Sequence, residues 1–431
     1  MTYTTLASAL WEAERSYASK NPKSAQAYGQ ATDHLPGGST RSSIFVHPFP
    51  LFIEKGEGGE LTDVDGHVYM DFVSDFTSGI YGKTHPLIRS AIISALDNGL
   101  QLGAHSTSES HLASLLCARF PSIDLIRFAN SGTEANILAI TAALRHTGKR
   151  KVVVFEDGYH GSVLSHFELS GSNWGGTHDM KVPFDYLVCP YNDIAGSDRV
   201  IQAHSDEIGA ILVEPMLGAG GCIPGDIDFL QYLRTKATDI GAALIFDEVQ
   251  TARLSTGGRQ KTLDIVPDMT TLGKFFGGGF AFGAFGGNRS IMQMFDARSS
   301  GAISHGGTFN NSPLTMAAGA VAVEKILTEE ALADLNQLGD WMRDSLNEAF
   351  ESKSLPFKMT GLGSINQVHC TLSKDSRTTG LSLLFHKLLG RGYWIAQRGL
   401  ISLSFAMTRK DVEGFVNAVI GCAEEVGKLA R

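Results

Sequence analysis

Two charged residues lie where they could take part in catalysis, because each follows an apolar run typical of a buried strand. Lys274 follows residues 270–273, and a buried lysine has a lowered pKa and can act as a neutral amine nucleophile. Asp247 follows residues 242–246, where a carboxylate needs a cationic or hydrogen-bonding partner. Each residue also has a structural alternative. Lys274 could be a surface lysine whose aliphatic stem is packed, and Asp247 could belong to a structural ion pair or cap a helix.

Two further sites could bind an anion and a planar ring. Ser131, Gly132 and Thr133 lie between a predicted strand and a predicted helix, where a hydroxyl and free N–H groups can bind phosphate. An ordinary helix cap without a ligand is the alternative. Tyr159 follows the apolar run 151–155, and its ring could stack on a planar ligand, although simple packing is the commoner role.

Other known motifs fail on the residues that their chemistry needs. The pair Gly273-Lys274 is not a phosphate-binding loop, because Phe275 stands where serine or threonine is required. The stretch 61–72 resembles a calcium loop, but neither its first nor its last position is a carboxylate. The motifs H-E-x-x-H and G-x-S-x-G do not occur, so we expect no metal site and no serine-hydrolase chemistry.

The elements that must position these residues alternate between strand and helix. The runs 151–155, 210–213 and 242–246 are almost entirely apolar, which predicts a mostly parallel sheet with helices on both faces. Ligands of such sheets bind beyond the carboxyl ends of the strands, where the candidate residues fall. We therefore predict an α/β fold in which the sheet belongs to a large domain.

We expect three segments along the chain. Residues 1–70 form an N-terminal segment that packs with the small C-terminal domain. It has one long amphipathic helix over about 5–35 and strand-like runs at 51–53 and 60–70. Residues 71–325 form the large domain, and residues 326–431 form a smaller α+β domain. A helix is predicted over 316–327. Gly277-Gly278-Gly279 is interpreted as a glycine-rich loop, and the glycine run 277–287 lacks the strand–GxGxxG–helix context of a dinucleotide fold.

Composition excludes several functional classes. The 431 residues carry 36 Lys and Arg against 45 Asp and Glu, a net charge of −9, so nucleic acid is not the expected partner. The five cysteines form no close pair, which indicates reduced thiols and a cytoplasmic protein. No apolar run approaches the roughly 20 residues of a membrane-spanning helix, so no membrane association is expected.

An ordered set of short motifs resembles the class III aminotransferases, which are pyridoxal 5'-phosphate (PLP) enzymes of fold type I. The resemblance extends over about residues 10–425. Each motif is weak by itself, but the order and spacing of all six are specific to this family. They are Asn130-Ser131-Gly132-Thr133-Glu134-Ala135, Tyr159-His160-Gly161, Glu214-Pro215, Phe246-Asp247-Glu248-Val249, Leu272-Gly273-Lys274 and Gly307-Thr308-Phe309.

The resemblance implies a role for each candidate. Lys274 would hold PLP as a Schiff base, and Asp247 would pair with the protonated pyridine nitrogen. Tyr159 and Val249 would flank the cofactor ring. Thr308 would reach the phosphate from a neighbouring subunit, which implies a homodimer with a shared active site. The phosphate itself would lie against Ser131, Gly132 and Thr133.

Within the class, the chain resembles the branch that contains glutamate-1-semialdehyde aminomutases and β-phenylalanine aminotransferases. The segment 36–42 is similar in both groups, and by this resemblance its Arg41 would bind a carboxylate. Arg398 stands where β-phenylalanine aminotransferases have arginine and aminomutases usually have an acidic residue. Both would hold substrate carboxylates. Gln250 departs from the methionine common to both groups and adjoins the aspartate motif.

These features together predict transamination of a β-amino acid, aromatic and similar to β-phenylalanine, with a 2-oxo acid as acceptor and ping-pong kinetics. A glutamate-1-semialdehyde 2,1-aminomutase and a transaminase of other amines are alternatives. A different PLP reaction and a binding protein without activity also stay open.

Overall fold

The computed structural model describes residues 5–165 and 181–430, which divide into two compact units. The first unit contains residues 5–85 and 335–430, and the second contains residues 86–165 and 181–334. Each unit has its own sheets, so each is described by itself.

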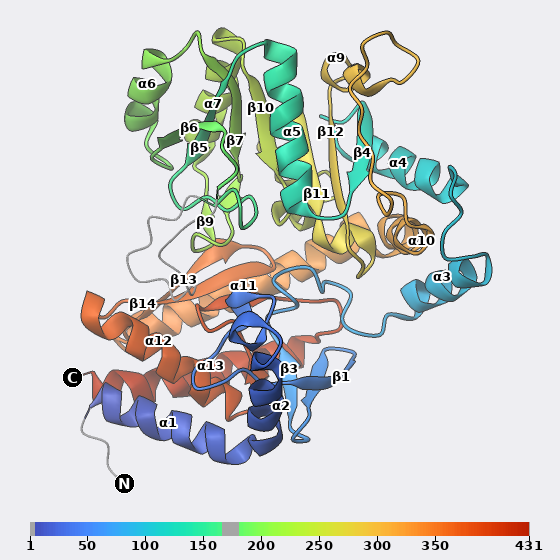
Figure 1. Cartoon of the computed structure of the whole chain (residues 1–431). Coiled ribbons are helices and arrows are strands. Elements are labelled where there is room, and N and C mark those ends of the chain that lie inside the picture. The colour runs from blue at the N-terminus through green and yellow to red at the C-terminus, as the bar shows by residue number, and fades with distance from the viewer. Residues whose placement is uncertain (1–4, 166–180, 431) are drawn as a thin grey trace. The chain divides into compact units, whose positions relative to one another are not determined.

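The second unit is built on a seven-stranded mixed sheet (Figure 1). Its neighbouring strands β11, β10, β7, β5 and β6 are parallel to one another, whereas β12 runs antiparallel to both β11 and β4. An α/β fold with a mostly parallel sheet is thereby confirmed. The strands, in their order across the sheet, are β4 (Leu125–Ala129), β12 (Gly283–Gly287), β11 (Met269–Gly273), β10 (Ala243–Asp247), β7 (Ile208–Val213), β5 (Lys151–Phe155) and β6 (Asp185–Cys189).

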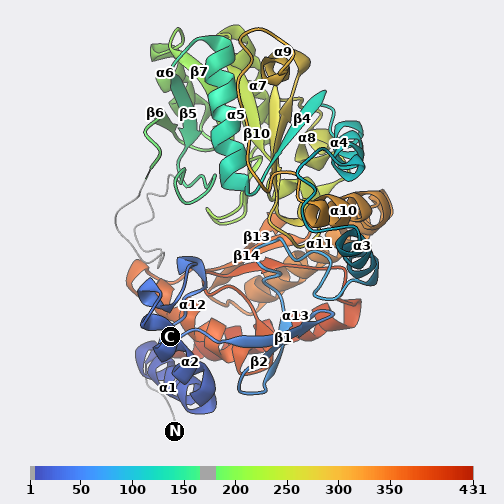
Figure 2. The same ribbon diagram turned by 45° about the vertical axis from the view of Figure 1, so that its right-hand side comes forward.

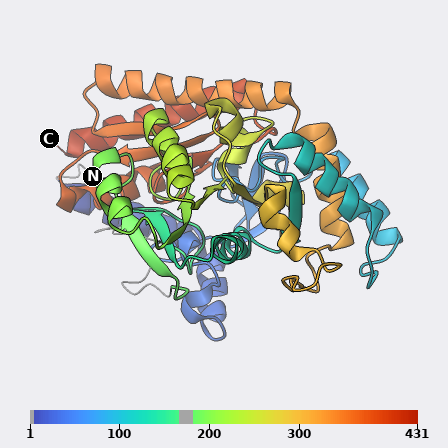
Figure 3. The ribbon, with the colours of Figure 1, turned by 90° about the horizontal axis from the view of Figure 1, so that it is seen from above.

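Helices cover both faces of this sheet because alternate strand residues are apolar on each side. Helix α5 (Gly132–Thr147) packs on the face that carries Val152 and Val154 (Figures 1 and 2). Helix α7 (Ile227–Asp239) packs on the opposite face, which carries Val153. Figure 3 looks along α5, drawn in teal, and shows it against one side of the strands.

Short elements complete the second unit. The helix predicted over 316–327 is α10 (Pro313–Val321), which continues as one π-helical turn (Ala322–Ile326). The glycine-rich loop expected at 277–279 precedes β12, a strand that was not predicted from the sequence. The other elements are α3 (Pro86–Asp97), α4 (Thr107–Arg119), α6 (Ile194–Ala203), α8 (Gly258–Leu263), α9 (Arg289–Met292), the strand pair β8 (Met216–Leu217) and β9 (Ile223–Pro224), and single turns at Thr251–Leu254, Lys274–Gly277 and Gln293–Phe295.

The first unit contains two small sheets and several helices. The single helix predicted over 5–35 was wrong, because Pro22 interrupts it and starts a second helix. Strand β1 begins only at Ile53, so the strand expected over 51–53 lies too early. The elements are α1 (Leu6–Lys20), α2 (Pro22–Thr32), turns Pro36–Gly38 and Ser42–Ile44, the sheet of β1 (Ile53–Glu57), β2 (Glu60–Asp63), β3 (Val68–Asp71) and β15 (Tyr393–Trp394), the sheet of β13 (Phe357–Leu362), β14 (Ile365–Cys370) and β16 (Leu400–Ser402), α11 (Glu329–Ser352) from Leu335 onward, α12 (Lys374–Leu389) and α13 (Arg409–Leu429).

No helix in the described part of the chain is both long enough and apolar enough to cross a lipid bilayer.

Candidate active site

Two candidate residues lie at the same edge of the large sheet. Asp247 is the last residue of β10, and Lys274 directly follows the neighbouring parallel strand β11. Asp247 pairs in register with Thr271, three residues before Lys274. Parallel strands bring their carboxyl ends to one edge, and this edge is where ligands bind in such sheets.

The Asp247 carboxylate is buried and accepts three hydrogen bonds. Its Oδ2 accepts from the Asn136 amide at 2.8 Å and lies 2.8 Å from Nδ1 of the buried His160 ring. Its Oδ1 accepts from the backbone N–H of Val249 at 3.0 Å. A buried carboxylate is costly without such partners, so this set holds the side chain in one orientation.

Asn136 is itself oriented by two further contacts. Its Oδ1 accepts a hydrogen bond of 2.6 Å from the Thr271 hydroxyl, so its amide group must face Asp247 and the carbonyl of His160. Sequence reasoning did not single out Asn136 or Thr271. A signal was present, because Asn136 is a polar residue among alanines on the buried face of α5.

A second buried carboxylate, Glu214, lies beside this network. It follows β7 and accepts hydrogen bonds from the backbone N–H groups of Tyr159, at 2.8 Å, and Gly218, at 3.0 Å. Burial raises the pKa of Glu214 to about 7, while His160 lowers it and Asp247 raises it by smaller amounts. Glu214 thus fixes the backbone at Tyr159, whose ring was the candidate for stacking.

The backbone before Lys274 packs closely against the start of α5. A Cβ atom at Gly273 would lie 3.1 Å from the Val249 side chain and 3.5 Å from the Gly132 backbone nitrogen. A Cβ atom at Gly132 would lie 2.9 Å from Val249. Lys274 has a left-handed backbone conformation (φ 54°), which is unfavourable for residues other than glycine. This packing brings Lys274, Val249 and Gly132 together.

The start of α5 has one hydroxyl engaged in capping. The Ser131 Oγ accepts a hydrogen bond from the Glu134 N–H at 3.1 Å. Thr133 lies against Gly161. A Cβ atom at position 161 would collide with the Thr133 hydroxyl. The exposed Thr308 lies in the turn that begins at Gly307.

That turn is joined to the start of α5 through two asparagines. The Asn310 Oδ1 accepts a hydrogen bond of 2.8 Å from the Asn130 side chain, and the Asn310 N–H donates to the Gly307 carbonyl at 3.1 Å. Asn130 directly precedes Ser131, so the turn that carries Thr308 is tied to the residues that cap α5.

In the first unit, Arg41 and Arg398 lie beside one aromatic ring. Their guanidinium carbons are 5.4 Å and 5.3 Å from the centroid of Phe76. Arg41 also donates a hydrogen bond of 2.8 Å to Asp75, and both side chains of this ion pair are about half exposed. Two cationic groups, which are 357 positions apart in the sequence, therefore share one ring in this unit.

The segment that carries Phe76 is strained. Residues 74–77 all have positive φ angles, between 46° and 78°, and none is glycine. A left-handed residue with a side chain costs roughly 1–2 kcal/mol, so the surrounding contacts must hold the segment in place. Ser74 donates a hydrogen bond of 3.0 Å to the Ser402 carbonyl, and the Ser402 N–H donates to the Phe72 carbonyl at 2.7 Å.

The family model of the class III aminotransferases matches residues 42–413, which is most of the chain. The chain belongs to the class III aminotransferases. It is 44% identical over 97% of its length to a β-phenylalanine transaminase of Variovorax paradoxus, of which it covers 96%. It is 33% identical over 92% of its length to a glutamate-1-semialdehyde 2,1-aminomutase of Methanosarcina acetivorans, of which it covers 97%.

Solved structures agree with this assignment. A β-phenylalanine aminotransferase of Variovorax paradoxus superposes with a TM-score of 0.94 at 42% identity, covering 98% of this chain and 99% of the other. Both the family and the fold type I architecture expected from the sequence are confirmed. This aminotransferase depends on PLP, as the class does.

The residues at the sheet edge of this aminotransferase fit PLP in two respects. Gly132 and Gly273 put no side chain over the backbone at the start of α5, where a Cβ atom on either residue would press against Val249. Gln250 is buried against Gly218, and among the described residues its Oε1 has no hydrogen-bond partner. A buried polar atom without a partner is costly, so an open acceptor here suits a site that receives a polar ligand.

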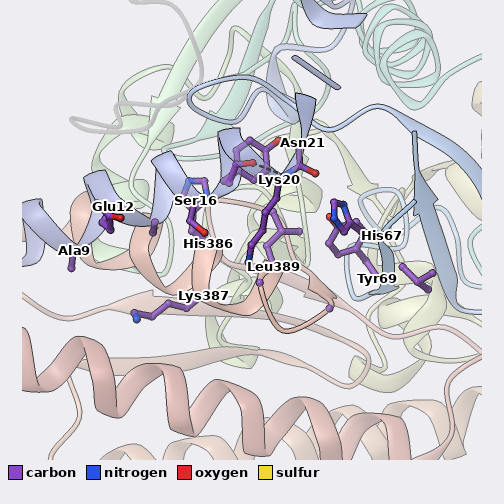
Figure 4. Close-up of a pocket in the computed structure, with 15 residues that line it drawn as sticks. Ala9, Glu12, Ser16, Lys20, Asn21, His67, Tyr69, His386, Lys387 and Leu389 are labelled. Atoms are coloured by element: carbon purple, nitrogen blue, oxygen red, sulfur yellow. Dashed lines mark hydrogen bonds between the residues drawn. The ribbon is translucent and has the colours of Figure 1, made fainter. Parts of the chain in front are cut away.

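The first unit also contains a hollow of about 540 Å³ between α1, β3 and α12 (Figure 4). Tyr17, Lys20, His67 and His386 are among its lining residues, and burial lowers the pKa of His386 to about 4. None of the candidate residues named above lines this hollow.

Proposed function

We propose that this aminotransferase transfers the amino group of an aromatic β-amino acid, similar to β-phenylalanine, to a 2-oxo acid such as 2-oxoglutarate or pyruvate. The observation that supports this most is the pair of guanidinium groups, Arg41 and Arg398, beside Phe76. A planar guanidinium binds a carboxylate through two parallel hydrogen bonds. Both donor and acceptor carry carboxylates, and the relative that is 44% identical is a β-phenylalanine transaminase.

We assign PLP to the edge of the large sheet. Lys274 would hold it covalently, and Ser131, Gly132 and Thr133 would bind its phosphate at the start of α5, where N–H groups and the helix dipole favour an anion. Tyr159 and Val249 would contact the two faces of the ring. When bound, PLP accepts the negative charge that develops on the substrate carbon bearing nitrogen.

Asp247 would face the pyridine nitrogen in this assignment. Its hydrogen bonds from Asn136 and the Val249 N–H, and its contact with His160, hold the carboxylate in one orientation. In that orientation the carboxylate would stabilise a proton on the ring nitrogen, which helps the ring to delocalise charge.

Lys274 is the residue that would carry the proton. Its free, neutral amine would take the proton from the substrate carbon that bears nitrogen and later return a proton on the same face. Release of the oxo product precedes binding of the acceptor, and the same residues then act in reverse order. Ping-pong kinetics follow from this sequence.

We infer that the active site is completed in a homodimer, with Thr308 reaching the phosphate of the neighbouring subunit. Thr308 is exposed, and the next residue, Phe309, has 57% of its surface exposed. Further large apolar side chains, Leu96 and Leu100, are about half exposed at the end of α3 and beyond it. Exposed apolar surface of this kind is typical of a contact with another protein chain.

Intramolecular amino transfer, as in glutamate-1-semialdehyde aminomutases, is the second candidate. The relative that is 33% identical over 92% of the chain supports it. The two reactions differ in their need for a second substrate. An aminomutase turns over its substrate without an added 2-oxo acid, whereas the proposed transaminase stops after one half-reaction.

The cofactor spectrum tests the proposed function directly. We expect 3-amino-3-phenylpropionate to bleach the aldehyde absorbance of the holoenzyme, and 2-oxoglutarate or pyruvate to restore it. Lys274→Ala is the negative control, since it lacks the covalent link and the proton carrier. Bleaching by glutamate-1-semialdehyde or a simple amine, with no response to the β-amino acid, would overturn the proposed substrate.

A further inference from the structure

The Phe76 ring lies within contact range of two arginine side chains. Its ring is half-buried, and it lies 5.4 Å from the guanidinium carbon of Arg41 and 5.3 Å from that of Arg398. Distances below about 6 Å allow attraction between a cation and the electron-rich face of a phenyl ring. One ring is therefore in contact range of both proposed carboxylate-binding groups.

The ring is held in place by its own backbone and by the strand that follows Arg398. The segment 74–77 has a left-handed backbone and is joined to β16 through Ser74 and Ser402. Arg398 lies in a tight turn before that strand, in which the Gly399 N–H donates to the Ala396 carbonyl at 2.8 Å. The ring and Arg398 are thus anchored to the same strand.

Arg41 has a different second partner. Asp75, the residue before Phe76, accepts its hydrogen bond at 2.8 Å with both side chains about half exposed. Exposed ion pairs of this kind contribute little to stability, so another carboxylate can replace Asp75 at low cost. Asp75 presents to Arg41 the same chemical group that a substrate would.

We propose that Phe76 is a positioning residue that holds both guanidinium groups for substrate carboxylates, and that Asp75 occupies Arg41 until a substrate carboxylate replaces it. This inference rests on the proposed function, in which Arg41 and Arg398 bind substrate. It adds that selection for carboxylates depends on an aromatic ring that itself makes no ionic contact.

The test compares Phe76→Leu with Phe76→Tyr in the holoenzyme. Leucine keeps an apolar side chain but removes the ring, and tyrosine keeps the ring. Phe45→Leu is the matched control, because Phe45 lies in the same unit and its ring contacts Tyr28. Binding of glutarate, a dicarboxylate that cannot react, is measured by calorimetry, and half-reaction rates are measured with 3-amino-3-phenylpropionate and with 1-phenylethylamine, which lacks the carboxylate.

We expect Phe76→Leu to weaken glutarate binding and to raise the KM for 3-amino-3-phenylpropionate by about tenfold, in line with the loss of two cation–ring contacts. The half-reaction with 1-phenylethylamine should not change, and Phe76→Tyr and Phe45→Leu should behave as the parent enzyme. Equal losses with both amines, or unchanged glutarate binding, would overturn the role of Phe76.

Asp75→Asn tests the exchange of carboxylates. The variant should bind glutarate about two- to fivefold more tightly, because the internal competitor for Arg41 is gone. Unchanged or weaker glutarate binding would contradict the proposal that a substrate carboxylate replaces Asp75 at Arg41.

Two results separate this inference from the proposed function. If the parent enzyme does not react with 3-amino-3-phenylpropionate but Phe76→Leu still weakens glutarate binding, the substrate is wrong and the inference holds. If the parent enzyme reacts and Phe76→Leu affects both amines alike, the function holds and the inference is wrong.

Discussion

The carboxylate of Asp247 in the second unit and the guanidinium of Arg41 in the first are held in opposite ways. Asp247 is 4% exposed and has three partners within 3.0 Å, namely the Asn136 amide, the His160 ring and the Val249 N–H. Arg41 is about half exposed and has a single carboxylate partner, Asp75. A group that must keep one orientation is buried and saturated, and a group that must exchange partners is exposed.

The largest expected effect comes from removing charge at the buried site. Asp247→Asn should lower the rate of every amine half-reaction by about 10²–10³-fold, as expected when a fixed electrostatic partner of the reaction is lost. The measurement is single-turnover absorbance with donors that carry a carboxylate and donors that lack one. If only the donors with a carboxylate were slowed, Asp247 would belong to substrate binding, and the contrast with Arg41 would disappear.

A pH-dependent change in stability should come from Glu214. Burial raises its folded-state pKa to about 7, above the ordinary value of 4.5, so its neutral form favours the folded state. Its contribution is complete below pH 4.5 and falls as the pH rises to about 7, by roughly 3 kcal/mol at most. The melting temperature of the holoenzyme should fall between pH 5.5 and pH 8. This fall should be smaller for Glu214→Gln than for the parent enzyme.

A tenfold effect is expected for the residue that orients Asp247. Asn136→Ala removes a hydrogen bond to Asp247 and leaves the Thr271 hydroxyl without its acceptor, which costs about 1–3 kcal/mol. Half-reactions with all donors should slow about equally, by roughly tenfold. The readout specific to positioning is the pH dependence of the cofactor absorbance, which should shift in Asn136→Ala. Thr141→Ala, on the same helix, is the control and should leave it unchanged.

The smallest effect is expected from salt, and it separates the two regions without a mutation. Raising the ionic strength from 0.05 M to 0.5 M should raise the KM for carboxylate substrates a few-fold, because charges around Arg41 are exposed and screened. The rate at saturating donor should stay constant, since the network around Asp247 is buried. A fall in that rate with salt, at unchanged KM, would reverse the comparison.

Sequence reasoning was successful where the signal is local. Apolar runs marked most strands of the large sheet, and the residues that follow them, such as Asp247 and Lys274, were singled out as candidates from this position. It failed where the pattern is weak or ambiguous. Strand β12 is rich in glycine and has the composition of a loop, and it becomes a strand because β4 and β11 both pair with it. Helices α1 and α2 were predicted from the sequence as one helix because the apolar period continues across Pro22.

The sequence by itself determined the family, the α/β fold class and the candidates Lys274 and Asp247, because short motifs and apolar periodicity are properties of neighbouring residues. Only the tertiary structure decided which distant groups meet. Asn136, His160 and Thr271 converge on one buried network because strand register and helix packing bring them together. The shared position of Arg41 and Arg398 at Phe76 likewise depends on a left-handed segment and its hydrogen bonds to β16, which no local pattern of residue types encodes.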